Sequence, residues 1–276
     1  MRIVSISDIH GELEAFDVFV DQLPKLNFDV VLIAGDLGGR KEAITILRKL
    51  AAFCKPIYYV MGNWDSFSYE ECLHKQATHI HLKHQRIGEW IFLGYSGSAA
   101  NGYKGHPTLN DSYATYQSNR RHNKRKFGTY ESYCKALILE ELSTYISIHQ
   151  IDVEDLVLVT HDRLYAPSFF PLLYVFGHRH QPKHTTYKGV HLVNTSAISM
   201  NSLFSRIPPD APGNFCLIEL EGLNCHVEFH KIPSPYARRQ DQRYPGVYHL
   251  ISSKTGKDTG VIFEDDPTRP LDADRG

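Results

Sequence analysis

Short apolar runs alternate with amphipathic stretches along the first 60 residues. The apolar runs have the β-branched composition of buried strands and lie at residues 2–7, 29–34 and 56–60. The stretches between them, 12–23 and 43–51, carry apolar side chains at helical spacing, and Pro24 ends the first of these helices. Strands that alternate with helices predict a parallel sheet with helices packed on it.

This pattern continues through the middle of the chain and then changes. Residues 90–95, 156–160 and 172–176 are further predicted strands, and Thr129 could cap a helix that precedes the second of them. After His180 the apolar segments become short and β-rich, with turn residues between them, which predicts antiparallel strands of a second sheet. These segments lie at 185–187, 190–193, 215–220 and 225–230.

The C-terminal part of the chain is polar and punctuated by proline. Residues 247–250 and 261–263 are expected to pair as a small hairpin, and residues 267–276 are expected to form a loose tail. We therefore expect one domain over residues 1–232 and a partly irregular C-terminal extension over residues 233–276.

Each of five predicted strands ends at a residue type that binds metal ions. Along the chain these residues are Asp8 with His10, Asp36, Asn63, His161, and His178 with His180. Ligands of open α/β sheets bind just outside the carboxyl ends of the strands, so we expect these side chains to meet at one edge of one sheet. Imidazole and carboxylate ligands suit Mn, Fe, Zn or Co better than Ca or Mg, and the set is large enough for two divalent ions.

The order and residue types of these motifs resemble the signature of the calcineurin-like metallophosphoesterase superfamily. The resemblance covers about residues 1–196 and runs from Asp8-x-His10 through Gly35-Asp36, Gly62-Asn63 and His161 to Gly177-His178-x-His180. It implies an α/β fold, a four-layer α/β/β/α sandwich of two mixed sheets flanked by helices. It also implies a metal-dependent hydrolase of phosphoesters.

The resemblance further implies a binuclear metal centre and its ligands. One ion would take Asp8, His10, Asp36 and His180, and the other would take Asp36, Asn63, His161 and His178. Two ions ~3.5–4 Å apart, bridged by a carboxylate and a water, lower the pKa of that water, so that a hydroxide nucleophile exists near neutral pH. Manganese is the ion that we expect. The candidate catalytic residues are Asp36, Asn63, His161, Arg163 and His180.

Trp64 departs from the family pattern, in which many members carry a histidine after the Gly-Asn pair. Tryptophan cannot act as a general acid, so esters with poor leaving groups should hydrolyse slowly, which favours phosphodiesters or activated phosphate esters as substrates. Trp64 could stack on a ring of the substrate or fill space under a loop. Arg163, which follows His161-Asp162, could contact a phosphate or pair with Asp162.

Residues 97–128 interrupt the α/β pattern and form an insert that could cover the metal edge as a cap. Residues 101–135 carry seven Lys and Arg residues with tyrosines interleaved. Basic groups contact phosphates and aromatic rings stack on bases, so this stretch could contact a nucleotide or nucleic acid, although a solvated loop and helix start is the simpler interpretation. His106 or His122 in such a cap could replace the missing general acid.

The overall composition narrows the class of protein. The chain has 276 residues, of which 42% are hydrophobic and 22% charged, and its net charge of −1 provides no global attraction to nucleic acid or membrane. Five Cys, an odd number without a CxxC pair, argue against a disulfide framework. Because no apolar stretch approaches the ~18 residues of a membrane span, we expect no membrane partner and a reducing, cytoplasmic location.

A non-catalytic scaffold of the same fold, which binds protein partners, is the alternative to an enzyme. Scaffolds of this kind usually lose metal ligands, whereas this chain keeps a suitable residue at every ligand position. Metal binding without turnover of any phosphoester, together with one stable protein partner, would favour the scaffold.

Overall fold

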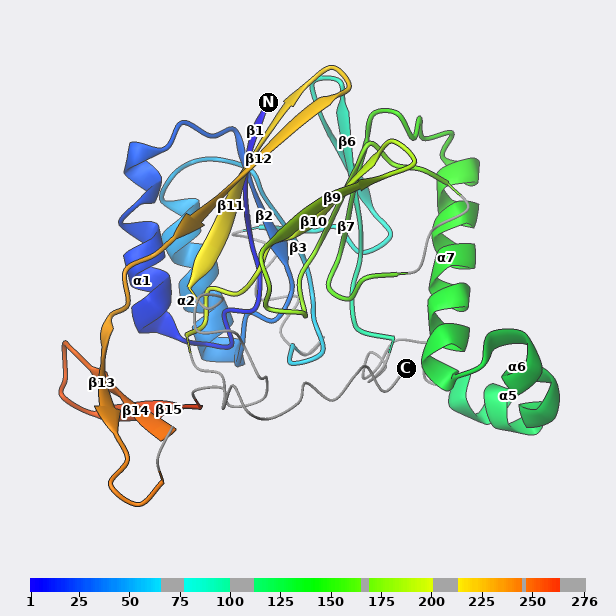
Figure 1. The fold of residues 1–276 in the computed structure, drawn as a ribbon. Helices are drawn as coiled ribbons and strands as arrows, with labels where there is room; N and C mark the ends of the chain where they lie inside the picture. Colours follow the sequence, from blue (N-terminus) through cyan, green and yellow to red (C-terminus); the bar gives the residue numbers. More distant parts are fainter. Residues whose placement is uncertain (66–76, 100–111, 165–168, 201–212, 245–246, 264–276) are drawn as a thin grey trace.

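Two six-stranded sheets pack face to face between outer layers of helices (Figure 1). The computed structural model describes residues 1–65, 77–99, 112–164, 169–200, 213–244 and 247–263. Helices α1 (Leu13–Val20) and α2 (Arg40–Ala51) cover the outer face of the first sheet, and α7 (Tyr130–Ile148) covers the outer face of the second. The four-layer α/β/β/α sandwich that the motifs implied is therefore confirmed.

The first sheet contains the strands that precede Asp8, Asp36 and Asn63. Its order is β12 (Asn224–Lys231), β11 (Asn214–Glu221), β1 (Arg2–Ile6), β2 (Val30–Ala34), β3 (Ile57–Val60) and β4 (Thr78–His79). The strands from β1 to β4 run parallel, with Ile3 opposite Val30, and β11 and β12 extend the sheet in antiparallel register on the other side of β1.

The second sheet contains the strands that precede His161 and His178. Its order is β5 (His84–Ile87), β6 (Trp90–Tyr95), β7 (Leu156–Thr160), β8 (Leu173–Phe176), β10 (Val190–Asn194) and β9 (Lys183–Tyr187). The four central strands β6, β7, β8 and β10 run parallel, and β5 and β9 pair antiparallel at the two edges. The parallel strands of each sheet thus carry the candidate ligands at their carboxyl ends.

Two expectations about strand pairing are wrong. The five strands that end in candidate ligands are divided between the sheets, with β1, β2 and β3 in the first and β7 and β8 in the second. The β-rich segments after His180 are also divided, because β9 and β10 extend the second sheet whereas β11 and β12 extend the first. The alternation of apolar residues records which faces of a strand are buried, but it does not record which neighbour the strand pairs with.

The hydrophobic core has one part between the sheets and another beneath the helices. In β2, where all five residues are buried, Val30, Leu32 and Ala34 belong to the inter-sheet core. Val31 and Ile33 belong to the core beneath the helices. Successive side chains of a strand point to opposite faces, so a strand covered on both faces needs an uninterrupted apolar run.

The described part of the basic insert is helical and mostly exposed, whereas the simpler interpretation of the sequence was a solvated loop and a helix start. It forms α5 (Ser112–Ser118) and α6 (Arg120–Phe127), while residues 100–111 lie outside the described residues. Thr129 caps α7 as predicted, and its Oγ1 accepts a hydrogen bond from Ser132 N at 3.1 Å. Of the helices in the described segments, none has the length together with the apolar composition that a bilayer crossing needs.

A three-stranded antiparallel sheet forms the described part of the C-terminal extension. Its strands are β13 (Tyr236–Gln240), β14 (Val247–Ser252) and β15 (Asp258–Phe263). The predicted hairpin is β14 with β15, whereas β13 was not expected. Ser252 Oγ donates a hydrogen bond to Glu14 Oε1 on α1 at 2.9 Å, and Tyr236 and Leu250 are buried in the main core, so this sheet packs beside α1 (Figure 1). The predicted tail, residues 267–276, lies outside the described residues.

Candidate metal centre

The side chains that follow the parallel strands converge where the carboxyl ends of the two sheets meet. Asp8 and His10 follow β1, Asp36 follows β2, Asn63 follows β3, His161 follows β7, and His178 and His180 follow β8. Contacts of 2.9–3.9 Å join all of them into one cluster. The predicted convergence is therefore present, but it is built from two facing sheets rather than from one edge of one sheet.

One group of contacts joins His10, His180 and Asp8. His180 Nε2 lies 3.0 Å from Asp8 Oδ1 and 3.3 Å from His10 Nε2. His10 Nε2 lies 3.7 Å from the same oxygen of Asp8. The three ligand atoms lie within 4.8 Å of one another, so one cation between them could contact all three.

A second group of contacts joins His161, Asn63 and His178. His161 Nε2 lies 2.9 Å from Asn63 Oδ1 and 3.2 Å from His178 Nδ1. Asp36 lies between the two groups, because its Oδ2 is 3.3 Å from His161 Nε2 and 3.9 Å from His10 Nδ1. A carboxylate in this position can contribute oxygen ligands to both groups.

The cluster contains two buried carboxylates, those of Asp8 and Asp36. Burial raises the pKa of Asp8, but its hydrogen bond with His180 and the charge of His161 outweigh burial and hold this pKa well below its usual range. Burial lowers the pKa of His161, but the charge of Asp36 and the hydrogen bond to it outweigh burial and raise the pKa to about 10. The carboxylates therefore attract positive charge, which a proton or a divalent cation can supply.

The three remaining imidazoles differ in their contact with these carboxylates. Burial lowers the pKa of His10 and also the pKa of His178. Burial lowers the pKa of His180 too, but its hydrogen bond with Asp8 outweighs burial and raises this pKa above the ordinary value. His10 and His178 are consequently neutral near pH 7 and present nitrogen lone pairs to the cluster.

Neighbouring groups fix the orientation of two candidate ligands. Ser7 Oγ donates a hydrogen bond to Asp8 Oδ2 at 2.6 Å. His161 Nδ1 donates to the carbonyl oxygen of Ala34 at 2.8 Å, because a carbonyl oxygen can only accept. That bond turns His161 Nε2 toward the cluster, as a metal-binding imidazole requires.

Asp65 ties together the loops that follow β2 and β3, and the motif analysis assigned no role to it. Its carboxylate accepts hydrogen bonds from Asp36 N and Gly62 N, each at 2.8 Å, and from Gly38 N at 3.2 Å. The only sequence signal for this role is its place two residues beyond a predicted ligand. The three donors named above are backbone N–H groups, which nearly every residue type has, so the sequence does not indicate them.

Backbone strain is concentrated in this cluster. Asp8, His10, Asp36, His178 and His180 all have φ between 51° and 67°. They make up half of the ten non-glycine residues with positive φ in the described part of the chain. Such residues are uncommon, and they occur preferentially at functional sites, where the surrounding structure holds them in place.

Close packing explains why glycine precedes two of the ligands. A Cβ atom on Gly62 would lie 2.0 Å from Asp36 Oδ1, and a Cβ atom on Gly177 would lie 2.7 Å from Asp8 Oδ2. Both distances are shorter than any ordinary van der Waals contact of a Cβ atom. The backbone can therefore approach these carboxylates only where a side chain is absent.

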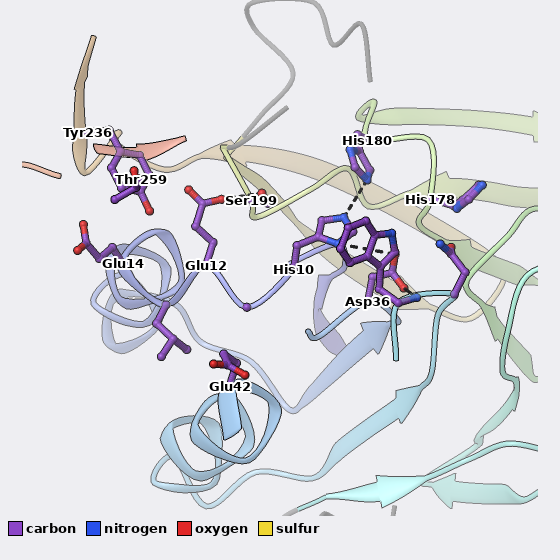
Figure 2. A pocket seen from close by; sticks show the side chains of 14 residues that line it. His10, Glu12, Glu14, Asp36, Glu42, His178, His180, Ser199, Tyr236 and Thr259 are labelled. Atoms are coloured by element: carbon purple, nitrogen blue, oxygen red, sulfur yellow. Dashed lines mark hydrogen bonds and ion pairs between the residues drawn. The ribbon is translucent and has the colours of Figure 1, made fainter. Parts of the chain in front are cut away.

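A cavity of about 670 Å³ lies beside the cluster and reaches the C-terminal sheet (Figure 2). At the cluster it is lined by His10, Asp36, Asn63, His178 and His180, and farther away by Glu12, Glu14, Glu42, Ser199, Tyr236 and Thr259. Trp64 lines it as well, with 51% of the residue exposed and its ring edge-on to His10 at a centroid distance of 5.2 Å. The backbone N of Trp64 donates to Asp36 Oδ1 at 2.9 Å, which places this indole at the mouth of the cluster.

Arg163 does not line this cavity, whereas the candidate catalytic residues Asp36, Asn63 and His180 do. Its guanidinium lies 5.8 Å from the centroid of the Phe176 ring, and it borders a smaller, separate cavity. Asp162, the other partner considered for it, has its Oδ2 3.6 Å from Lys135 Nζ. The position of Arg163 thus supports neither of the two roles considered for it.

The basic insert lies away from this cavity. Helices α5 and α6 extend beyond one end of α7, on the opposite side of the molecule from β13–β15 (Figure 1). His122 is exposed and lines a separate hollow with Arg120 and Arg121. His106, the other candidate for a general acid, lies outside the described residues.

The fold has counterparts among solved structures. TT1561 of Thermus thermophilus has a similar structure, with a TM-score of 0.51 and 15% identity over 82% of this chain and 97% of that chain. Yfce, a phosphoesterase from E. coli, gives a TM-score of 0.43 and 13% identity over 96% of this chain and all of that one (100%). At 15% identity, the likeness to TT1561 bears on the fold alone. The chain matches no curated protein sequence. A sequence model described as calcineurin-like phosphoesterase matches residues 1–182, about two thirds of the chain, and this protein therefore belongs to the calcineurin-like phosphoesterase family.

Proposed function

We propose that the strand-end cluster binds two divalent cations, with manganese as the expected ion, and hydrolyses phosphoesters. One ion would be held by Asp8, His10, Asp36 and His180, and the other by Asp36, Asn63, His161 and His178. The observation that carries this proposal is the contact of these side chains, from two different sheets, around two buried carboxylates. Membership of the calcineurin-like phosphoesterase family supports the reaction class.

The donor atoms fit divalent cations. Two nitrogen ligands at ~2.0–2.1 Å from one tetrahedral ion lie ~3.3 Å apart. The nitrogen atoms of His10 and His180 are 3.3 Å apart, and those of His161 and His178 are 3.2 Å apart.

Bound cations would supply Lewis acidity toward the phosphate oxygens and would lower the pKa of a water molecule at the site. The protein groups hold and orient that centre. Asn63 offers an oxygen ligand without a negative charge that would repel the phosphate. Ser7 and Ala34 hold Asp8 and His161 in place before the substrate arrives, so the site needs little reorganisation during the reaction.

The shape of the cavity supports a phosphodiester or an activated phosphate ester as the substrate. The cavity continues from the cluster to Tyr236, which leaves room for a second ester group that a phosphomonoester lacks. Trp64 stands beside the cluster and cannot protonate a leaving group. Its exposed ring supports the interpretation that it stacks on a ring of the substrate.

A nucleotide or nucleic acid is the second candidate for the substrate. The exposed side chains of Arg120, Arg121 and Lys124 on α6 support contact with a phosphate backbone through residues 101–135. Glutamates on the wall of the main cavity would repel a polyanion, so a nucleic acid would have to approach from the insert rather than along this cavity.

The test compares an aryl phosphodiester, an aryl phosphomonoester and single-stranded RNA, each with and without manganese. We expect metal-dependent turnover, fastest with the diester, and we expect Asp36→Asn to lose both bound metal and turnover. Asp21→Asn, which changes an exposed carboxylate, is the matched control and should keep both. Wild-type protein that binds no metal and hydrolyses none of the esters would refute the proposal. Metal binding without turnover would favour the scaffold.

A further inference from the structure

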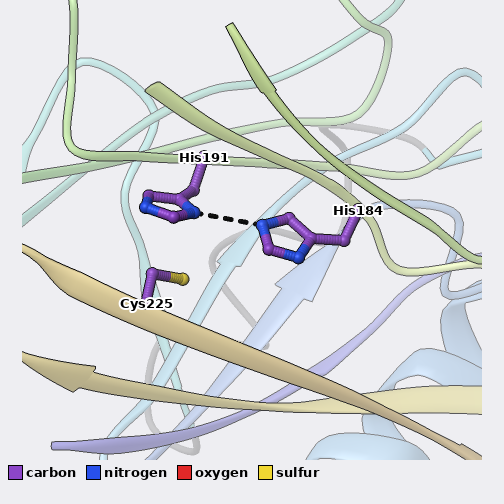
Figure 3. Close-up of side chains that lie close together, drawn as sticks. All are labelled: His184, His191 and Cys225. Carbon is purple, nitrogen blue, oxygen red and sulfur yellow. Dashed lines mark hydrogen bonds between the residues drawn. The ribbon is translucent and has the colours of Figure 1, made fainter. Parts of the chain in front are cut away.

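A second group of metal-binding side chains lies apart from the cavity described above. It consists of His184 on β9, His191 on β10 and Cys225 on β12, and Figure 3 shows the three side chains turned toward one another. One ligand atom from each residue lies within 4.8 Å of the other two. None of the three lines the cavity of the strand-end cluster.

Strand register explains why the two imidazoles are neighbours. In the antiparallel pair of β9 and β10, His184 lies opposite Val193 and His191 lies opposite Thr186. Residues that face each other, and residues two apart on one strand, share a face of the sheet, so both imidazoles are on the face of Val193. Val193 belongs to the inter-sheet core, and that face therefore looks toward the first sheet.

Cys225 reaches the same space from the opposite sheet. It lies on the face of β12 that carries Val227 and Phe229, and all three pack against the inter-sheet core. β9 is the edge strand of the second sheet and β12 is the edge strand of the first. The three side chains therefore meet where the two sheets leave one side of the sandwich open.

The spacing of the two imidazole nitrogens fits a metal site as well as a hydrogen bond between the rings. His184 Nε2 and His191 Nδ1 are 3.1 Å apart, close to the ~3.3 Å between two nitrogen ligands of a tetrahedral zinc ion. The rings are stacked, with centroids 5.3 Å apart and planes inclined by 26°. The Cys225 thiol lies within 4.8 Å of a ring nitrogen of each histidine, so the cluster offers a third donor besides the hydrogen-bonded pair.

We propose that His184, His191 and Cys225 bind one zinc ion that joins the edge strands of the two sheets. Two imidazole nitrogens and one thiolate form a donor set that suits zinc, and a water would complete a tetrahedron. Burial lowers the pKa of both His184 and His191, which favours their neutral forms, and it raises the pKa of Cys225 to about 12, so zinc would have to displace the thiol proton. The proposal is independent of the phosphoesterase activity, because no residue is shared with the strand-end cluster.

Cobalt substitution in the full-length protein provides the test. A cobalt–thiolate charge-transfer band in the near ultraviolet distinguishes this site from the strand-end cluster, which contains no cysteine. We expect the band to appear with one equivalent of cobalt at this site and to disappear when zinc is added in excess. Cys225→Ser and His191→Gln should abolish the band, whereas Cys54→Ser, which removes an exposed thiol, should leave it unchanged.

A measurement on the wild-type protein avoids dependence on how the variants fold. Zinc should protect Cys225 from alkylation by iodoacetamide at least tenfold, as quantified by mass spectrometry, while the rate at the exposed Cys54 stays the same. Equal alkylation of Cys225 with and without zinc would overturn the proposal. A cobalt spectrum without the thiolate band, or a band that survives in folded Cys225→Ser, would overturn it as well.

Discussion

The Asp65 carboxylate accepts hydrogen bonds from three backbone N–H groups in the loops that carry Asp36 and Asn63. Its Oδ2 accepts from Asp36 N and Gly62 N, and its Oδ1 accepts from Gly38 N. Asp65→Asn replaces one oxygen by an NH2 group of the same size. If the remaining oxygen keeps the two shorter bonds, the NH2 group faces a third N–H donor with which it cannot bond.

The expected loss of stability follows from these three bonds. Hydrogen bonds to a charged group contribute about 1.5–3 kcal/mol, and neutral ones about 0.5–1.5 kcal/mol. In Asp65→Asn two of the hydrogen bonds become neutral and one is lost. Because Asp65 is only partly buried, we expect the free energy of unfolding to fall by about 3 kcal/mol. Asp65→Ala leaves all three N–H donors without the carboxylate, so its free energy of unfolding should fall further. Because Asp65 holds Asp36 N, metal affinity should fall about 10–100-fold, as for other residues that orient metal ligands.

Urea unfolding and manganese titration of the wild type and of both variants measure these effects. Stability should decrease in the order wild type, Asp65→Asn, Asp65→Ala. Asp21→Asn, at an exposed position, is the control and should match the wild type in both assays. The reasoning is refuted if Asp65→Asn has the urea midpoint and the manganese affinity of the wild type.

Three other experiments test the close packing, the helix cap and the C-terminal sheet. Gly62→Ala should displace the Asp36 carboxylate and lower kcat/KM for an aryl phosphodiester about 100-fold. The control Gly88→Ala, where no atom lies within 4 Å of the new Cβ, should keep the activity. Thr129→Ala should lower the free energy of unfolding by about 1 kcal/mol, and Thr129→Ser should restore most of it; equal urea midpoints would contradict the cap. The hydrogen bond with Asp241 raises the pKa of His249 above the ordinary value of 6.5. Protonated His249 should therefore stabilise the β13–β15 sheet fully below pH 6.5, and this stabilisation should be lost as pH rises through the higher pKa of the folded state. An NMR titration of His249 with an unshifted midpoint would disprove this.

The candidate ligands could be recognised in the sequence because each stands at a local boundary. The pattern is an apolar run long enough for a strand, followed directly by a metal-binding residue, as at Asp36 and His161. It spans only a few consecutive positions and can therefore be read from the sequence. The resemblance in motif order then implied the right four-layer fold. Both inferences use information that lies close together along the chain.

Other parts of the site depend on pairings that no local pattern records. Asp65 acts through backbone N–H groups of another loop, and Arg163 follows a ligand in sequence but lies over the Phe176 ring. His191 and Cys225 were two of many unassigned residues until register and sheet order brought them together.

The sequence by itself determined the strands that end in candidate ligands, the helices α1, α2 and α7, the candidate ligands and the family. Only the tertiary structure decided that these ligands come from two facing sheets, that the cavity leads toward the C-terminal sheet, and that β9 and β12 are edge strands. The physical reason is that burial imposes a periodicity on each strand separately, whereas the choice of a neighbouring strand depends on competition among all the strands of the chain.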